Sequence, residues 1–474
     1  MLGEYSPKLN RGLCIVLFLL SAFLLFFNLG KDAFIDYDEA TYATVLRESI
    51  LSENYITFSY LGEPWFDKPP LYFWLAGASV KLFGMNEFAE RLPSAVAGLL
   101  LVILLYHTTL RLTKNPIAAF FAGAILTTNS SFIDAARQMR LDVPVTLCIV
   151  ATIYCFLRRK DNARWLVGIG VAIGFGILMK SVIGFLAIPI ICIISMFERD
   201  WSWLKQKWLW LGAVGFFLVV VPWHYASFSH FGPIFWQEYF GKHIMSRFNS
   251  NMLGGNITIL DYVRNLFKLT EPWVLVFCGT LAWLILNFKK NKEALRLPLA
   301  LSLSAIFIFC LFSMSRTKLF YYLMPLYPLW ALAIGLSFNV YHRSLVEFEQ
   351  KILVGFFAIL TLVGLASGIN FGWNVADTDY FRAFTEEEKK IGLLLDQNIS
   401  TEKIYVHNHL YWETLRYYNG GRSLEVPSSG VPDEPFFIIT DPRSVPTEIQ
   451  KRMVTPMYTG KYLWLVNVES NFRN

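Results

Sequence analysis

Residues 13–29 read LCIVLFLLSAFLLFFNL, and residues 36–48, shortly after them, read DYDEATYATVLRE. The first stretch is almost entirely apolar and follows Lys8 and Arg11, as the core of a secretory signal peptide would. No small-residue cleavage site of the A-x-A type comes after it, and many further apolar runs do. The two stretches therefore predict an uncleaved first membrane-spanning helix that leads into an acidic loop.

The composition extends this prediction to most of the chain. Hydrophobic residues make up 55% of the 474 residues, charged residues make up 16%, and the mean hydropathy is +0.42. These values exclude an ordinary water-soluble globule. The sequence predicts an all-α polytopic membrane protein of about 11 to 13 spans, with candidates at 12–30, 92–111, 116–133, 143–157, 165–179, 182–197, 208–225, 272–288, 297–315, 321–340 and 352–372.

Basic residues predict the orientation of these spans, because short connections rich in Lys and Arg belong on the cytoplasmic side. The connections of this kind hold Lys8/Arg11, Arg111/Lys114, 158–164, 199–207, 289–296 and Arg343/Lys351. The long loops 31–91 and 226–271 and the tail then face outward. The tail, 373–474, contains the strand-like runs KIYVHN, FFIITD and YLWLVNV, which predicts a small soluble α/β domain after a membrane domain of residues 1–372.

Other features of the composition carry less information. The six cysteines lie in apolar runs without CxxC pairs, so we interpret them as packing residues and infer no redox compartment from them. The net charge of +6 is modest and its basic residues are scattered between spans. Membrane topology explains them better than binding to nucleic acid does.

Three carboxylates crowd the start of the first outer loop. Asp36 and Glu39 have the spacing of a helix-capping pair, and residues 39–51 predict a short amphipathic helix on the membrane surface. Capping leaves Asp38 unexplained, since a further acid in the first turn gains only about 0.3 to 1 kcal/mol from the helix dipole. We therefore expect Asp38 to be functional.

Three further outer-side positions each allow a structural and a functional interpretation. Asp67 and Lys68 precede two prolines and a second interfacial helix, and form either a surface ion pair of little value or part of a cavity. Asp142 is placed to cap the fourth span and also to face whatever lies above it. Lys180 interrupts an apolar stretch at a cost of roughly 2.5 to 3.5 kcal/mol, so it either snorkels outward or pairs with an anion.

The second long loop and the connection before the tenth span add basic and aromatic residues. His243 and Arg247 are four residues apart and share one helix face, although a lone histidine is more often structural. Lys318 stands close to Tyr321 and Tyr322, as in an interfacial anchor or a phosphate site. Carboxylates suited to proton abstraction would thus share one membrane face with cations suited to a phosphate.

These residues lie in motifs that resemble a known family. YDEATYATVLRE, GEPWFDKPPLYFWL, RLDVP, GILMKSVIG and SRTKLFYYLMPLYP resemble, in this order, motifs of the GT-C-fold membrane glycosyltransferases, in the group of the lipid A aminoarabinose transferases and the relatives of dolichyl-phosphate-mannose protein mannosyltransferases. The similarity covers most of residues 10–340. It implies the GT-C fold and an inverting transfer of one sugar from a polyprenyl-phosphate-sugar to a lipid, glycan or protein acceptor outside the cytoplasmic membrane.

The resemblance also implies roles for single residues. Asp38 is implied as the catalytic base or acceptor-orienting carboxylate, with Asp142 in support. The resemblance implies that Lys180, Lys318 and Tyr321 or Tyr322 lie near the donor phosphate, and we expect Arg247 there as well. It implies that Asp67 and Lys68 line the cavity, and we also expect Glu39 and His243 in the cavity or at the acceptor.

The chain departs from the family pattern at a few positions. In the aminoarabinose transferases that the chain resembles, the third residue after the first aspartate is an arginine, whereas this chain has Thr41 there. The phosphate contact is then missing or comes from another arginine, namely Arg47, Arg247 or Arg316. A divalent metal would find at most two ligands in Asp67 and His243.

Two other classes of function compete with the transferase. A lipid-linked sugar flippase or secondary transporter predicts ionisable residues near the midplane and repeats between halves, whereas Lys180 is the only clear candidate within a span. A structural protein whose outer loops bind a partner predicts that Asp38 and Asp142 tolerate replacement by asparagine.

Overall fold

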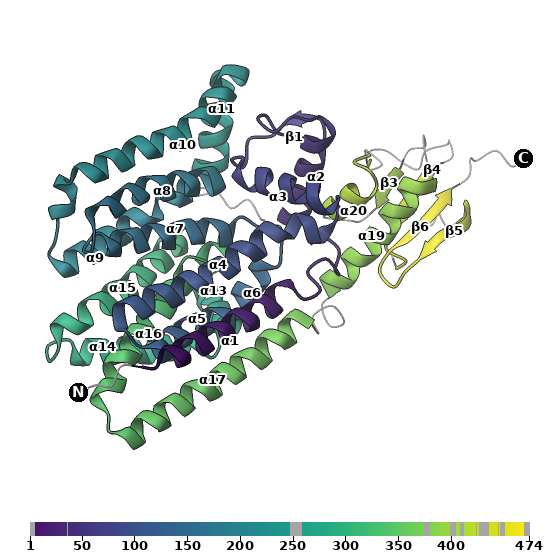
Figure 1. Ribbon diagram of the computed structural model, residues 1–474. Helices are drawn as coiled ribbons and strands as arrows, with labels where there is room; N and C mark the ends of the chain where they lie inside the picture. The colour runs from purple at the N-terminus through teal and green to yellow at the C-terminus, as the bar shows by residue number, and fades with distance from the viewer. Residues whose placement is uncertain are drawn as a thin grey trace, which may run out of the picture.

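A computed structural model describes residues 5–35, 37–246, 258–373, 380–398, 404–407, 412–422, 424–425, 436–443, 445 and 451–468. Figure 1 shows a bundle of long helices with a small α/β region at one end, next to α2 (Asp38–Leu51). We call this end of the bundle the α2 end. The structure therefore confirms the predicted fold class, a helical membrane part followed by a small sheet.

Seven helical segments are long and apolar enough to cross a membrane, or up to nine if two bent pairs each count as one span. The seven are α1 (Pro7–Phe26), α4 (Glu87–Thr113), Ala163–Glu198, α10 (Lys207–Phe231), α15 (Lys292–Met314), Phe320–Ser344 and Glu347–Ile369. The bent pairs are α5 (Pro116–Thr127) with α6 (Ser130–Ala136), and α13 (Ile259–Thr270) with α14 (Trp273–Asn287). This count refers to the described residues only.

The predicted number of about 11 spans exceeds this count for two reasons. One predicted span, α7 (Asp142–Arg158), has only 17 residues, and the segment Ala163–Glu198 was predicted to be two spans. The chain does reverse within that segment, because Lys180 pairs with Asp142 at one end of α7 and Glu198 pairs with Arg159 at the other. The reversal separates α8 (Leu166–Lys180) from η2 (Ser181–Leu186) and α9 (Ala187–Glu198).

The helices differ in how deeply they are enclosed. The span Phe320–Ser344 combines η5 (Phe320–Leu323) and α16 (Leu326–Ser344). In its most apolar 18-residue window 94% of the residues are buried, whereas in that of Lys207–Phe231 only 17% are. The outer helices α1, α10 and α17 (Glu347–Trp373) thus leave apolar side chains for lipid, as a membrane protein requires. Close helix contact occurs where glycines meet: a Cβ atom at Gly170 of α8 would overlap the carbonyl oxygen of Gly212 of α10.

The first long loop contains α2, the short hairpin β1 (Ser59–Tyr60) and β2 (Glu63–Pro64), and α3 (Leu71–Phe83). Both predicted helices of this loop exist. However, the prediction that α2 is an amphipathic helix on the membrane surface is wrong, because its residues Glu39–Leu46 are all buried. The helix is enclosed by its neighbours, among them α3, β1 and α20 (Glu413–Tyr418).

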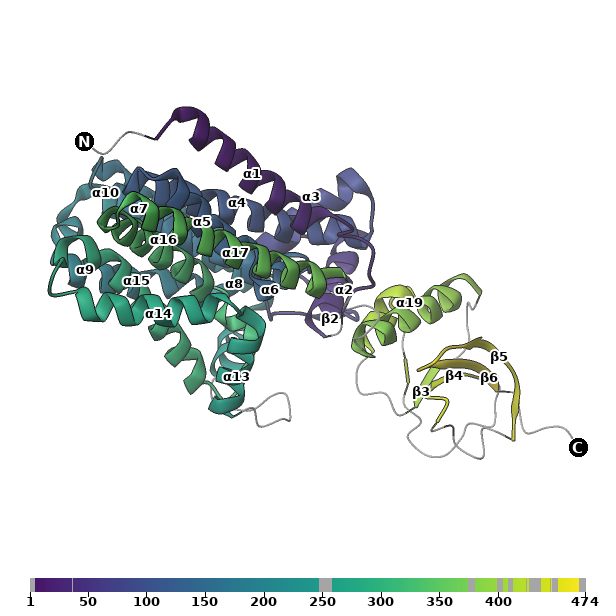
Figure 2. The same ribbon diagram turned by 90° about the horizontal axis from the view of Figure 1, so that it is seen from below.

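The C-terminal region forms a four-stranded sheet in the order β3-β4-β6-β5 (Figure 2). Its elements are α19 (Tyr380–Asn398), β3 (Ile404–His407), α20, β4 (Phe436–Thr440), β5 (Met453–Thr459) and β6 (Trp464–Val468). β3 pairs in parallel with β4, and the other pairs are antiparallel. All three predicted strand runs are strands, whereas β5 was not predicted.

The basic connections gather at the opposite end of the bundle. Arg111 pairs with Asp161 after α7, and Arg343 at the end of α16 donates a hydrogen bond to Thr113 O at the end of α4. The C-terminal region and α2 lie together at the other end (Figure 1). The predicted separation of the basic connections from the long loops is therefore confirmed as an arrangement of the chain.

Candidate active site

Four charged side chains form a continuous row at the α2 end of the bundle. Arg140 Nη2 lies 2.9 Å from Asp38 Oδ2, and its Nε lies 3.7 Å from Asp142 Oδ2. Lys180 Nζ lies 2.5 Å from the other oxygen, Asp142 Oδ1. Three of these residues were predicted to be functional from separate motifs, and the fold brings them together.

The two aspartates are the first residues of their helices, but neither carboxylate caps its helix. The N-cap residues are Tyr37 before α2 and Leu141 before α7, and neither N-cap makes a side-chain cap hydrogen bond. The interpretation of Asp142 as an N-cap is therefore wrong, because its oxygens are directed to cations instead. The cap predicted for Asp36 lies outside the described residues.

Lys180 is the last residue of α8 and pairs with an anion, as predicted. The chain turns at Ser181, whose φ of 50° and ψ of −138° lie in a region that favours glycine. This turn directs η2 back along α8, where Gly184 approaches Gly176 so closely that a Cβ atom would lie 2.6 Å from the Gly176 carbonyl carbon. The position of Lys180 thus depends on a tight and strained reversal.

Two tyrosines of η5 lie against the cations of this row. The Arg140 guanidinium carbon is 3.4 Å from the ring centroid of Tyr321, and Lys180 Nζ is 5.5 Å from that of Tyr322. The Tyr321 hydroxyl also donates a hydrogen bond of 3.0 Å to Asp134 Oδ2. Both tyrosines therefore lie beside basic side chains of the row, and their place near a donor phosphate stays a prediction.

Asp67 and Lys68 join the site through Tyr42 of α2. Lys68 Nζ lies 2.6 Å from Asp67 Oδ2 and 5.7 Å from the Tyr42 ring centroid, and its side chain is only 6% exposed. Burial raises the pKa of Tyr42 well above its ordinary value, and the nearby carboxylates of Asp38 and Asp67 raise it further. Tyr42 therefore stays protonated between these groups, and the pair is not the exposed surface ion pair of the structural interpretation.

Lys318 lies on the connection that leads into η5. Its Nζ donates a hydrogen bond of 2.8 Å to the carbonyl oxygen of Ser315. The side chain of His243 and the whole of Arg247 lie outside the described residues. Among the residues that the structure describes, no group of three or more His, Cys, Asp and Glu side chains is arranged to hold a metal ion.

Glu39 differs from its prediction as a cavity residue. Its side chain is fully buried and pairs with Arg91 at 2.8 Å and 3.0 Å through both oxygens. It also accepts hydrogen bonds from the backbone N–H groups of Ile35 and Met139. Because all these contacts are internal, Glu39 fastens the loops around the site and does not line a cavity.

Arg140 is the site residue that sequence reasoning missed. It belongs to the motif RLDVP, in which only the aspartate received a role. Arg140 brings a guanidinium to Asp38 although position 41 holds a threonine, whose hydroxyl donates to Tyr37 O. Two of the arginines proposed to replace the one missing at position 41 can be located. Arg47 donates to Tyr417 O in the C-terminal region, and Arg316 is exposed.

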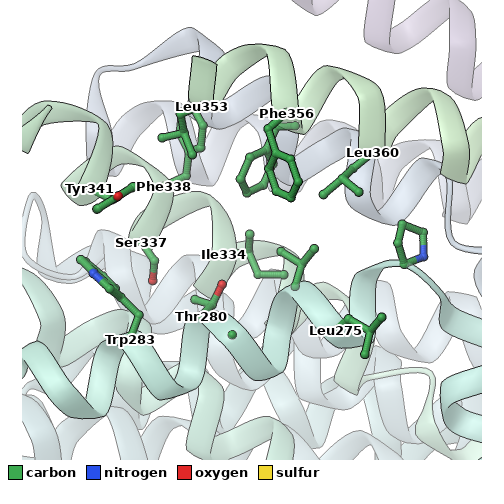
Figure 3. A pocket seen from close by; sticks show the side chains of 14 residues that line it. Leu275, Thr280, Trp283, Ile334, Ser337, Phe338, Tyr341, Leu353, Phe356 and Leu360 are labelled. Carbon is green, nitrogen blue, oxygen red and sulfur yellow. The ribbon is translucent and has the colours of Figure 1, made fainter. Parts of the chain in front are cut away.

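Two apolar cavities differ in their relation to this row of charges. A cavity of about 400 Å³ begins at Ser181, next to Lys180, and extends between α8, α10 and η4 (Gln237–Ser246), where His224 and Tyr239 line it. A cavity of about 490 Å³ lies between α14, α16 and α17, away from the charged residues (Figure 3). Of these two cavities, only the first is lined by a direct chain neighbour of a residue in the row, namely Ser181.

This arrangement suits group transfer to a hydroxyl. A carboxylate such as Asp38 can accept a proton, and neighbouring cations can stabilise negative charge on a departing phosphate. The described residues thus supply both requirements within one contiguous set of side chains.

Comparisons with known proteins agree with the motifs and the fold. Residues 67–225 match the family model described as dolichyl-phosphate-mannose-protein mannosyltransferase. Over 300 residues the chain is 29% identical to an undecaprenyl phosphate-alpha-4-amino-4-deoxy-L-arabinose arabinosyl transferase of Pseudomonas fluorescens, covering 61% of this chain and 49% of that protein. It is 28% identical to an uncharacterized protein of Aquifex aeolicus, over 73% of this chain and 68% of that protein.

A solved structure extends the likeness to almost the whole fold. The crystal structure of ArnT from Cupriavidus metallidurans bound to undecaprenyl phosphate has a TM-score of 0.74 at 20% identity and covers 96% of this chain and 97% of that chain. The chain spans about half the length of the curated arabinosyl transferases that it matches. These comparisons confirm the resemblance drawn from the motifs: the chain has the fold of the GT-C membrane glycosyltransferases and is related to them in sequence.

Proposed function

We propose that the protein is an inverting glycosyltransferase that moves a single sugar from a polyprenyl-phosphate-sugar to a lipid, glycan or protein acceptor. The observation that carries the proposal is the row Asp38, Arg140, Asp142 and Lys180, which joins a candidate base to candidate phosphate ligands. The kinship with arabinosyl transferases that act on undecaprenyl phosphate sugars supports the class of donor.

In the proposed reaction Asp38 accepts the proton of the acceptor hydroxyl. The acceptor oxygen then forms a bond to the anomeric carbon, the bond between that carbon and the phosphate oxygen breaks, and the polyprenyl phosphate leaves with the electron pair. Attack on the face opposite the leaving group inverts the configuration. Asp142 supports the base indirectly, because it contacts the Arg140 guanidinium through Nε while Asp38 contacts it through Nη2.

The donor phosphate is proposed to lie near Lys180, whose ammonium would exchange part of its contact with Asp142 for the phosphate. The further ligands proposed from the resemblance are Lys318, Tyr321, Tyr322 and Arg247. The apolar cavity that begins at Ser181 supports a place for the first isoprene units, since it adjoins Lys180 and is lined by aromatic side chains. Asp67, Lys68 and His243 remain the proposed lining of the acceptor side.

The site is proposed to face outward from the cytoplasmic membrane. The concentration of basic connections at the opposite end of the bundle supports this orientation. A transporter would require charged groups within its spans, whereas Asp38, Asp142 and Lys180 all lie at helix ends. The division into a transferase domain, 1–372, and an extracytoplasmic domain, 373–474, belongs to the same proposal.

The test has two stages. Mass spectrometry of envelope lipids and proteins from a deletion strain should reveal products that lack one sugar and give its mass. The purified protein, reconstituted with the matching undecaprenyl-phosphate sugar and the acceptor, should then release undecaprenyl phosphate. Asp38→Asn should lower this rate at least about 100-fold, and Asp161→Asn, at the opposite end of the bundle, should not. Equal rates in the two variants would remove Asp38 as the base.

A further inference from the structure

The segment between α1 and α2 is held by the C-terminal region through its backbone. Ala33 N donates a hydrogen bond of 2.5 Å to Glu386 Oε1 of α19. Phe34 N donates to the Tyr418 hydroxyl at 3.2 Å, and Phe34 O accepts from Thr414 Oγ1 at 2.9 Å, both from α20. Residues more than 350 positions later in the chain thus satisfy consecutive backbone groups of this loop.

A charged contact lies beside these hydrogen bonds. Arg382 of α19 reaches Asp32 Oδ2 and Asp134 Oδ1, each at 3.4 Å, and its side chain is only 15% exposed. Asp134 is also the acceptor for the hydroxyl of Tyr321, whose ring lies under Arg140. Arg382 therefore contacts the loop on one side and, through two intermediates, the guanidinium of the candidate active site on the other.

The same region also holds α2 directly. Arg47, in the third turn of α2, donates a hydrogen bond of 2.6 Å to Tyr417 O of α20. The loop and the helix are continuous, and Asp38 is the first residue of α2. The segments on both sides of Asp38 thus contact α19 and α20.

A second anchor fixes the C-terminal region to the bundle itself. Lys389 Nζ lies 2.5 Å from Glu87 Oε1, and the Tyr418 hydroxyl donates to the same oxygen at 2.6 Å. The Tyr417 hydroxyl donates to Glu90 Oε1 at 2.7 Å. Glu87 and Glu90 belong to the first turn of α4. The C-terminal region is therefore attached to a spanning helix and can hold the loop in a fixed position relative to that helix.

We infer that Arg382 and Glu386 are positioning residues, through which the C-terminal region holds the loop 31–35 and keeps Asp38 in place for sugar transfer. The inference rests on the proposed function for its kinetic readout. Positioning errors of about 1 Å can cost as much as 100-fold in rate without loss of substrate binding. The effect of losing the contact should therefore appear in kcat and not in KM.

The kinetic test uses the full-length protein reconstituted with donor and acceptor. Arg382→Gln should lower kcat at least about 10-fold while KM for the donor stays within about twofold, and Arg382→Lys should recover most of the rate because it retains the charge. Lys390→Gln, on the exposed side of the same helix, is the matched control and should match the wild type. Unchanged kcat in Arg382→Gln would overturn the inference while leaving the transferase itself intact.

A second measurement is independent of activity. Hydrogen–deuterium exchange at the Ala33 amide, whose acceptor is Glu386, should be slow in the wild type and at least about 10-fold faster in Glu386→Ala, since an amide that loses its acceptor is open to exchange. Spans such as α16 should keep their protection, which separates a local release from unfolding. If the wild type lacks transfer activity the proposed function fails, but equal exchange in Glu386→Ala and the wild type would still overturn the positioning role.

Discussion

Lys180 Nζ and Asp142 Oδ1 lie 2.5 Å apart and join the end of α8 to the start of α7. Both side chains are mostly buried, with exposed fractions of 14% and 6%. A buried ion pair contributes little net stability as a whole, but removal of one partner leaves an uncompensated charge. The stability of the α2 end of the bundle therefore depends on keeping both residues of the pair.

Lys180→Met should destabilise the protein and weaken donor binding. Among the described residues, the loss leaves the Asp142 carboxylate with the 3.7 Å contact to Arg140 alone, and loss of one partner of a buried ion pair costs about 3 to 5 kcal/mol. Thermal unfolding in detergent should show a lower midpoint, and titration with undecaprenyl phosphate a weaker affinity. Lys160→Met, whose lysine is 55% exposed and pairs with Glu198 at the opposite end, is the control that should change neither.

Arg140→Lys should lower the transfer rate even though it keeps the positive charge. The guanidinium contacts two aspartates and lies over the Tyr321 ring, with its central carbon 3.4 Å from the ring centroid, whereas a lysine ammonium offers no planar fork. We expect kcat to fall at least about 10-fold because Asp38 loses its fixed orientation. Steady-state release of undecaprenyl phosphate measures this, and Arg164→Lys, at the opposite end, should behave as the wild type. An Arg140→Lys enzyme at full rate would contradict the role given to the guanidinium.

The contrast between Arg140 and Lys180 shows how far the sequence could predict this site. Lys180 was predicted because a charge in an apolar run is conspicuous and expensive. Arg140 stands in a polar connection, where an arginine is ordinary, and its partner Asp38 is 102 positions away. Patterns along the chain predict spans and helix starts, but they do not predict which distant loops meet.

Glu39 illustrates the same limit from the other side. Its distance of three residues from Asp36 predicts a cap, and the resemblance implies a cavity residue, yet the side chain pairs with Arg91. Likewise the spacing of polar and apolar residues predicts α2 as a surface helix, whereas α3, β1 and α20 enclose it. The local sequence of a helix does not show which other segments of the chain will cover it.

Arg91→Met should lower stability more than it lowers the intrinsic activity of the folded fraction. Arg91 donates to Glu39 and to the carbonyl oxygens of Leu29, Asp32 and Ala33, so its loss frees a fully buried carboxylate and three acceptors. The expected cost is about 3 to 5 kcal/mol. The midpoint of thermal unfolding should fall strongly, whereas Arg264→Met, an exposed arginine, should leave it unchanged. An unaltered midpoint in Arg91→Met would show that the buried pair is not holding the loop.

Gly170→Ala should separate α8 from α10 and thereby disturb the end of α8 that carries Lys180. A methyl group at Gly170 would overlap the Gly212 carbonyl oxygen, which is backbone and cannot rotate away. Small residues let membrane helices approach closely, so even this substitution should cost about 1 to 3 kcal/mol of strain. Thermal unfolding and donor affinity should both decline. Gly355→Ala in α17, where no atom lies within 4 Å of the new Cβ, is the matched control and should be neutral or slightly stabilising. If both alanine variants unfold at the wild-type temperature, the contact between α8 and α10 is looser than the backbone distance implies.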